Sequence, residues 1–110
     1  MSKYELHSNL IIEMCERLEK TELNKIKEPN VWDSTLMRFQ VIGETLKKIP
    51  DKLKKKFPNV KWKNFEWFRN QISHEYRTIY PEVISELIKS DLKNLKQAII
   101  KIRGENDFKK

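Results

Sequence analysis

Glycine and proline are scarce in this sequence, with two glycines and four prolines among 110 residues. Sandwiches and barrels built on tight turns use these residues at many chain reversals, so their scarcity argues against both fold classes. No run of eighteen apolar residues is present, and a membrane-spanning helix is therefore not expected. Residues 1–20 alternate charged with apolar side chains and lack the apolar centre of a signal peptide, which favours a cytoplasmic protein.

Cysteine and histidine are also rare. Cys15 is alone, so it cannot form an internal disulfide, and its apolar helical row predicts a buried structural thiol. His7 and His74 lie far apart, and neither belongs to a His-x3-His pair or a cysteine cluster. The sequence has no glycine-rich phosphate loop either. We therefore predict no metal site and no cofactor.

Positive charge exceeds negative charge. The chain has 23 Lys and Arg residues against 16 Asp and Glu residues, for a formal net charge of +7. A basic surface favours an anionic partner such as RNA. However, the excess is mostly lysine, and isoleucine and asparagine are also abundant, which is the composition that an AT-rich genome encodes. Charge alone does not decide between these two explanations.

Apolar side chains recur at three- and four-residue spacing in four segments, which predicts helices. The first runs over residues 2–23, and residues 28–30 then break the pattern. The second starts at Asp33 or Ser34, either of which can cap a helix, and ends near Ile49. Gly43 in its middle costs about 1 kcal/mol relative to alanine, which a close helix crossing would explain.

The second half of the chain continues the helical pattern. Residues 51–57 are rich in lysine and predict a short turn, and a third helix is expected over residues 61–76. Pro81 suits the first turn of a fourth helix, and Gly104 is expected to end it. Short connections favour an antiparallel bundle. We predict one all-α domain of four or five helices over residues 1–104, followed by a polar tail over residues 105–110.

Four side chains able to support chemistry are concentrated near the end of the third helix: Arg69, Asn70, His74 and Tyr76. On a regular helix Asn70 and His74 share a face, whereas Arg69 and His74 diverge by about 140°. The two could meet if the arginine side chain curls round, if the helix loosens near its end, or if the site spans a cleft between two copies. The sequence favours none of these.

This set of side chains suits metal-free cleavage of RNA. His74 can move the proton of a ribose 2′-OH, Arg69 can hold the scissile phosphate, and Asn70 can orient either one. A tyrosine can stack on a base or bond a phosphate. The competing interpretation is that Arg69 pairs with a carboxylate and His74 is an ordinary exposed histidine. Composition alone favours the competing interpretation, because Arg-x4-His occurs by chance in many proteins.

Two stretches together resemble a known family. Residues 69–76 read Arg-Asn-Gln-Ile-Ser-His-Glu-Tyr, similar to the Arg-Asn-x3-His-x-Tyr signature of HepT-like toxin ribonucleases in the HEPN superfamily. Residues 37–44 read Met-Arg-Phe-Gln-Val-Ile-Gly-Glu, which resembles the Ile-Gly-Glu element of that family. Trp62 falls where the family often has a tryptophan. Order and spacing agree from Val31 to Ile102.

The resemblance implies a dimeric helical bundle whose motifs line a shared cleft. It also implies a metal-independent endoribonuclease, the toxin of a type VII-like toxin–antitoxin pair. The antitoxin would be a minimal nucleotidyltransferase that adenylylates the motif tyrosine. By this resemblance Arg69 and His74 are catalytic, Asn70 supports them, and Tyr76 is the modification site.

Two further predictions concern surfaces. Lysines cluster just before the third helix and are expected to bind RNA beside the site, unless they are a solvated loop: Lys54, Lys55, Lys56, Lys61 and Lys63. Trp67 lies off the main apolar stripe and is our candidate for a homodimer interface.

Two other functions compete with the ribonuclease. One is a non-catalytic HEPN module that binds a nucleotide or a partner nucleotidyltransferase, and the other is a structural helical dimer. The complete set of four motif residues favours the ribonuclease.

Overall fold

The structure is a computed structural model that describes residues 4–75 and 78–108. Its elements, in order, are α1 (Glu5–Glu19), the 3₁₀ turn η1 (Leu23–Lys25), α2 (Pro29–Leu46), α3 (Asp51–Lys54), α4 (Trp62–Glu75), α5 (Pro81–Glu86), the π-helical turn η3 (Leu87–Asp91) and α6 (Leu92–Phe108). No strand occurs in these two ranges, so the all-α prediction is confirmed. None of the helices described is both long and apolar enough to cross a membrane.

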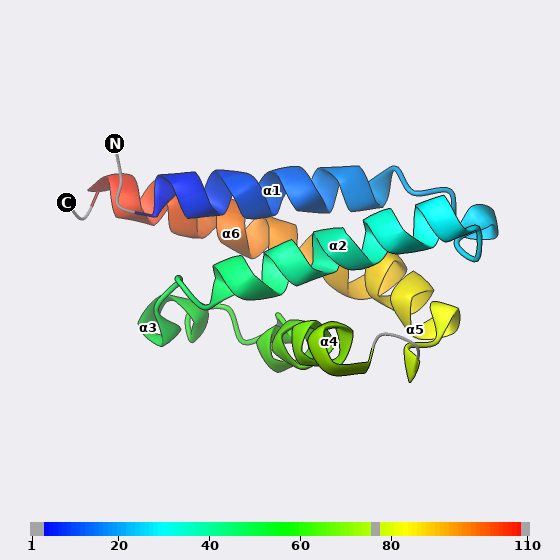
Figure 1. Cartoon of the computed structure of the whole chain (residues 1–110). Helices are drawn as coiled ribbons and strands as arrows, with labels where there is room; N and C mark the ends of the chain where they lie inside the picture. Colours follow the sequence, from blue (N-terminus) through cyan, green and yellow to red (C-terminus); the bar gives the residue numbers. More distant parts are fainter. Residues whose placement is uncertain (1–3, 76–77, 109–110) are drawn as a thin grey trace.

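The helices pack as a bundle in which α2 lies between a long antiparallel pair and α4 (Figure 1). α1 and α6 form the pair, and polar contacts at both ends confirm their antiparallel course. Arg103 Nη1 donates to Asn9 Oδ1 at 2.7 Å, and the Lys96 ammonium lies 3.0 Å from Glu19. The packing of α2 against α4 matters most for function, because α4 carries the chemical motif.

Three phenylalanines hold α2 against α4. Phe39 of α2 packs against Phe65 and Phe68 of α4, with ring centroids 6.5 and 5.6 Å apart. All three side chains are buried. Buried aromatic side chains of this size dominate the packing free energy of a small core. Because Phe65 and Phe68 face α2, they also fix the rotation of α4 about its axis.

Gly43 allows α2 and α4 to approach closely. A Cβ atom added to this glycine would collide with the Cβ of Arg69, would lie 2.9 Å from its Cγ, and would lie 3.3 Å from the carbonyl oxygen of Phe65. The predicted close crossing at Gly43 is therefore confirmed. The partner at this crossing is the candidate catalytic residue Arg69.

The first two helices have different ends from those predicted. α1 ends at Glu19, because Glu22 adopts an extended backbone with ψ of 102°. α2 begins at Pro29 instead of Asp33 or Ser34, since proline needs no N–H partner in a first helical turn. The Ser34 hydroxyl does not cap the helix. It donates to the carbonyl oxygen of Asn30 at 2.9 Å, within α2.

The prediction that Gly104 ends the last helix was wrong. α6 continues through residues 105–108, where a polar tail was expected, and the added Cβ of residue 104 would meet nothing within 4 Å. A lone glycine lowers helix stability without stopping the helix when no left-handed residue follows. The predicted fourth helix is present as one unbroken helical stretch, in which α5, the π-helical turn η3 and α6 follow one another directly.

Cys15 is fully buried, as its apolar row predicted. Burial raises the pKa of the Cys15 thiol to about 12, and the nearby Glu19 carboxylate adds to the effect. The thiol therefore stays protonated at neutral pH and packs as an apolar group.

Substituting each glycine with alanine should have opposite effects. We expect Gly43→Ala to lower the free energy of unfolding by about 1–3 kcal/mol, because the methyl group forces α2 and α4 apart. Gly104→Ala has room for its methyl group and should raise the free energy of unfolding by up to about 1 kcal/mol, since alanine is the better helix former. Urea unfolding followed by circular dichroism measures both. Equal effects for the two variants would contradict the close crossing.

Candidate functional site

The guanidinium of Arg69 lies on the side of α4 that faces α2. Its Nε donates to Oε1 of Glu44, its Nη2 forms an ion pair with the same oxygen, and its Nη1 donates to Asn70 Oδ1 at 3.0 Å. The Arg69 side chain is 23% exposed, so solvent reaches part of it. Three contacts therefore hold one charged group at the surface of the bundle.

The local sequence explains this arrangement. Gly43 brings the two helix backbones together, and Glu44 follows it directly in α2. A carboxylate at this position therefore reaches the arginine that packs on the glycine. In the sequence the Ile-Gly-Glu element served only as a mark of resemblance, and Glu44 was not identified as the carboxylate that pairs with Arg69. A glutamate next to a glycine at a helix crossing was the available signal.

Arg69 retains N–H groups that could bind a phosphate. A guanidinium has five N–H groups, and the hydrogen bonds to Glu44 and Asn70 use the one on Nε and one on Nη1. Within the described part of the chain, the other N–H groups on Nη1 and Nη2 donate no further hydrogen bond. Two N–H groups can bind a phosphate oxygen pair in the planar geometry that arginine favours.

His74 is exposed, one helical turn beyond Asn70 on the same face of α4. No hydrogen bond or ion pair among the described residues links it to Arg69. Of the three arrangements considered for these two residues, the structure disfavours two. Arg69 is turned to Glu44 instead of curling toward His74, and α4 stays helical through Glu75. A cleft between two copies remains.

The fourth motif residue, Tyr76, lies outside the described residues. The competing interpretation predicted an Arg69–carboxylate pair and an exposed His74, and both features are present. The ion pair occupies one edge of the guanidinium only, so it is compatible with phosphate binding by the other donors.

The five predicted RNA-binding lysines differ in exposure. Four are exposed: Lys55, Lys56, Lys61 and Lys63. Lys54 is 7% exposed, and its ammonium lies 3.8 Å from Asp51. Burial and this ion pair make Lys54 the least suited of the five to contact RNA.

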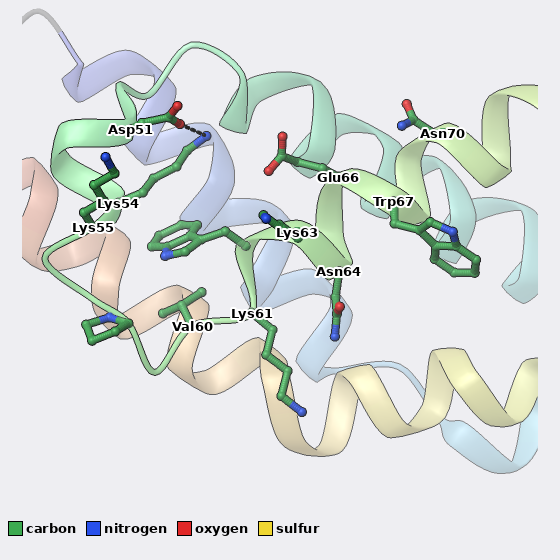
Figure 2. A pocket seen from close by; sticks show the side chains of 12 residues that line it. Asp51, Lys54, Lys55, Val60, Lys61, Lys63, Asn64, Glu66, Trp67 and Asn70 are labelled. Atoms are coloured by element: carbon green, nitrogen blue, oxygen red, sulfur yellow. Dashed lines mark ion pairs between the residues drawn. The ribbon is translucent and has the colours of Figure 1, made fainter.

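A groove joins the lysine cluster to the motif (Figure 2). Its volume is about 940 Å³. It is lined by Asp51, Lys54, Lys55, Pro58, Val60, Lys61, Trp62, Lys63, Asn64, Glu66, Trp67 and Asn70. Lys54 and Lys55 lie at one end, Trp67 and Asn70 lie at the other, and Lys63 and Glu66 lie between them. We call this the α3–α4 groove.

The described ranges contain no group of three or more His, Cys, Asp or Glu side chains arranged to hold a metal ion. Of the motif residues, the structure brings Arg69 and Asn70 into contact. Glu44 joins them through its ion pair with Arg69.

Comparisons with known proteins agree with the motif. No solved structure gives a significant match. A Methanocaldococcus jannaschii protein named "Gamma-glutamylcyclotransferase and putative RNase MJ0434" is 29% identical over 96% of this chain, which spans 50% of that protein. "Putative RNase MJ0127" of the same organism is 28% identical over 74% of this chain and 71% of its own length. "Probable ribonuclease HepT" of Thermococcus cleftensis is 27% identical over 64% of each chain.

The sequence profile of the family described as ribonuclease HepT-like matches residues 6–102, which include every helix that packs around the site. This match covers the Gly43 crossing, the Arg69–Glu44 pair and His74. The chain therefore belongs to the HepT-like ribonuclease family.

Proposed function

We propose that this protein is a cytoplasmic endoribonuclease that cleaves RNA without a metal ion. One observation carries the proposal: Glu44 fixes the Arg69 guanidinium while N–H groups on Nη1 and Nη2 donate no further hydrogen bond within the described residues, beside Asn70 and on the helix that presents His74. Membership of a ribonuclease family and the relatives named as RNases support it.

The chemistry follows from these side chains. His74 takes the proton of a ribose 2′-OH as its oxygen attacks the adjacent phosphorus. The bond from phosphorus to the 5′-oxygen of the next nucleotide breaks, and that oxygen takes up a proton from water. The products are a 2′,3′-cyclic phosphate and a 5′-OH. Arg69 stabilises the negative charge that develops on the phosphate oxygens, and Asn70 holds the guanidinium in place.

We further propose that the active form is a homodimer. Arg69 and His74 point in different directions in one copy, so a site containing both is more easily completed by the motif of a second copy. A chain of this size also has a small core, and a dimer interface would add buried apolar surface.

We also propose how the activity is controlled. The protein would be the toxin of a type VII-like toxin–antitoxin pair, and a cognate minimal nucleotidyltransferase would add AMP to Tyr76. In sequence Tyr76 follows His74 by two residues. A bulky anionic group there would compete with RNA phosphate for the guanidinium and would obstruct the site, so electrostatics and volume both favour inhibition.

The ion pair itself favours a second candidate function. Glu44 neutralises Arg69, which is the arrangement expected if the arginine only stabilises the helix crossing. The chain would then be a non-catalytic module of the same family that binds a nucleotide or a partner nucleotidyltransferase. RNA cleavage by the purified protein separates the two.

The central prediction is cleavage that survives EDTA. Purified protein should cut RNA in the presence of the chelator and leave a 2′,3′-cyclic phosphate, because the 2′-OH is the nucleophile. His74→Ala and Arg69→Ala should each abolish cutting and retain the helical circular dichroism spectrum. Activity that requires Mg²⁺, or that persists in both variants, contradicts the assignment.

Removing the charge of Glu44 tests its positioning role. Glu44→Gln should lower kcat by about tenfold to a hundredfold, because a less firmly held guanidinium misplaces the phosphate. Its effect on stability should be small, since the Glu44 side chain is 45% exposed. Glu13→Gln is the matched control, because it breaks the 2.9 Å ion pair with Arg17 on α1. Cleavage by Glu44→Gln that equals or exceeds the control would show that Glu44 does not position Arg69 for catalysis.

Tyr76→Phe tests the modification site. The variant keeps the ring and loses the acceptor oxygen, so it should fold, cleave RNA and escape silencing by the nucleotidyltransferase and ATP. Intact mass spectrometry measures the added AMP. The same additions on wild type and on Tyr76→Phe would place the modification elsewhere.

A further inference from the structure

We propose that the α3–α4 groove binds a single-stranded segment of RNA, with bases stacked on its apolar floor and Trp67 and with phosphates along its lysines. This inference rests on the proposed ribonuclease function, because it assigns the path by which the substrate reaches His74. It adds a binding site that lies outside the four-residue motif.

Apolar and aromatic side chains form much of the groove. Val60 is buried, and the Trp62 indole is half-buried and donates from Nε1 to the carbonyl oxygen of Phe57 at 3.1 Å. Trp67 is different, because 54% of it is exposed. Its ring meets the buried Phe68 ring edge-on, with centroids 5.7 Å apart. That contact steadies the indole while leaving much of it open to a base.

Lysines give the groove its charge. Of its four lysines, three are exposed: Lys55, Lys61 and Lys63. The Lys61 ammonium lies 3.9 Å from Asp91, in a contact that leaves the side chain 65% exposed. Two carboxylates also line the groove. Asp51 already faces Lys54, and Glu66 lies between Lys63 and the Trp67 end (Figure 2). The balance is positive, which suits a phosphate backbone.

The groove points to the catalytic histidine. Lys63, Trp67, Asn70 and His74 follow one another at spacings of four, three and four residues, which places them on one face of α4. Trp67 and His74 are about 10 Å apart along the helix axis. A base stacked on Trp67 therefore lies close to the nucleotide whose 2′-OH would meet His74.

The chemistry of the groove distinguishes its occupant. RNA can cover an apolar floor only with bases whose faces are free. Single-stranded RNA has such bases, whereas base pairing and stacking bury these faces inside a duplex. A second copy of this chain packed on the groove would bring its own excess of positive charge, a formal +7, against the lysines of the groove. The observations therefore favour single-stranded RNA over duplex RNA and over a protein partner at this position.

Binding can be measured without cleavage by placing every variant in the His74→Ala background. The probe is a short fluorescein-labelled single-stranded RNA of mixed sequence, followed by fluorescence anisotropy. Trp67→Ala should weaken binding by about fivefold to a hundredfold, the range that stacked bases show. Trp67→Phe keeps an aromatic face and should retain most of the affinity. The same RNA as a duplex should bind more weakly.

Charge variants test the phosphate path. The double variant Lys55→Gln/Lys63→Gln should reduce the magnitude of the slope of log affinity against log salt concentration by about 1.4. Each lysine that binds a phosphate releases about 0.7 counterion from a single strand. Glu66→Gln removes a negative charge and should tighten binding. The control pair is Lys20→Gln with Lys101→Gln, since both lysines are exposed and neither lines the groove. This pair should change affinity and slope much less.

Several outcomes would overturn the proposal. These are unchanged affinity in Trp67→Ala, equal salt slopes for the two lysine pairs, or duplex binding as tight as single-strand binding. A dimer that becomes a monomer in Trp67→Ala, by light scattering, would assign Trp67 to a contact between copies.

The test also separates this inference from the ribonuclease itself. If wild type cleaves RNA and the groove variants bind normally, the groove assignment alone fails. If wild type does not cleave and the groove variants still lose affinity, the binding site stands and the catalytic assignment fails.

Discussion

The close approach of α2 and α4 at Gly43 determines the rest of the site. The Phe39 contacts with Phe65 and Phe68 set how α4 is rotated, and the missing side chain at Gly43 sets how near it lies. Together they bring Arg69 against Glu44. The groove depends on the same rotation, because Trp67 faces outward only if Phe68 faces inward.

The helical pattern in the sequence was enough to predict the fold class, the close crossing at Gly43, and α4 almost to the residue. It failed at helix ends, where single residues compete: Pro29 could be interpreted as a break or as a first turn, and Gly104 as a stop or as a tolerated interior residue. Local propensities at such positions differ by about 1 kcal/mol, which packing of the neighbouring turns easily outweighs.

The motif residues were identifiable from sequence, whereas their contacts were not. Glu44 and Arg69 are 25 residues apart, so no local pattern links them before the helices are packed. The exposure of the lysines has the same origin. Lys54 and Lys55 are neighbours in a uniform basic stretch, yet the first is buried against Asp51 and the second is exposed, because a short helix turns one of them inward.

The contact at Gly43 involves the Cβ and Cγ atoms of Arg69, not its guanidinium. Most side chains at residue 69 supply the same carbon atoms, so the crossing is insensitive to the group that would contact phosphate. Folding and the proposed chemistry are thus separable at a single position. A lineage of this fold could lose its reactive arginine with little loss of packing, and selection for a stable bundle alone would not preserve the activity.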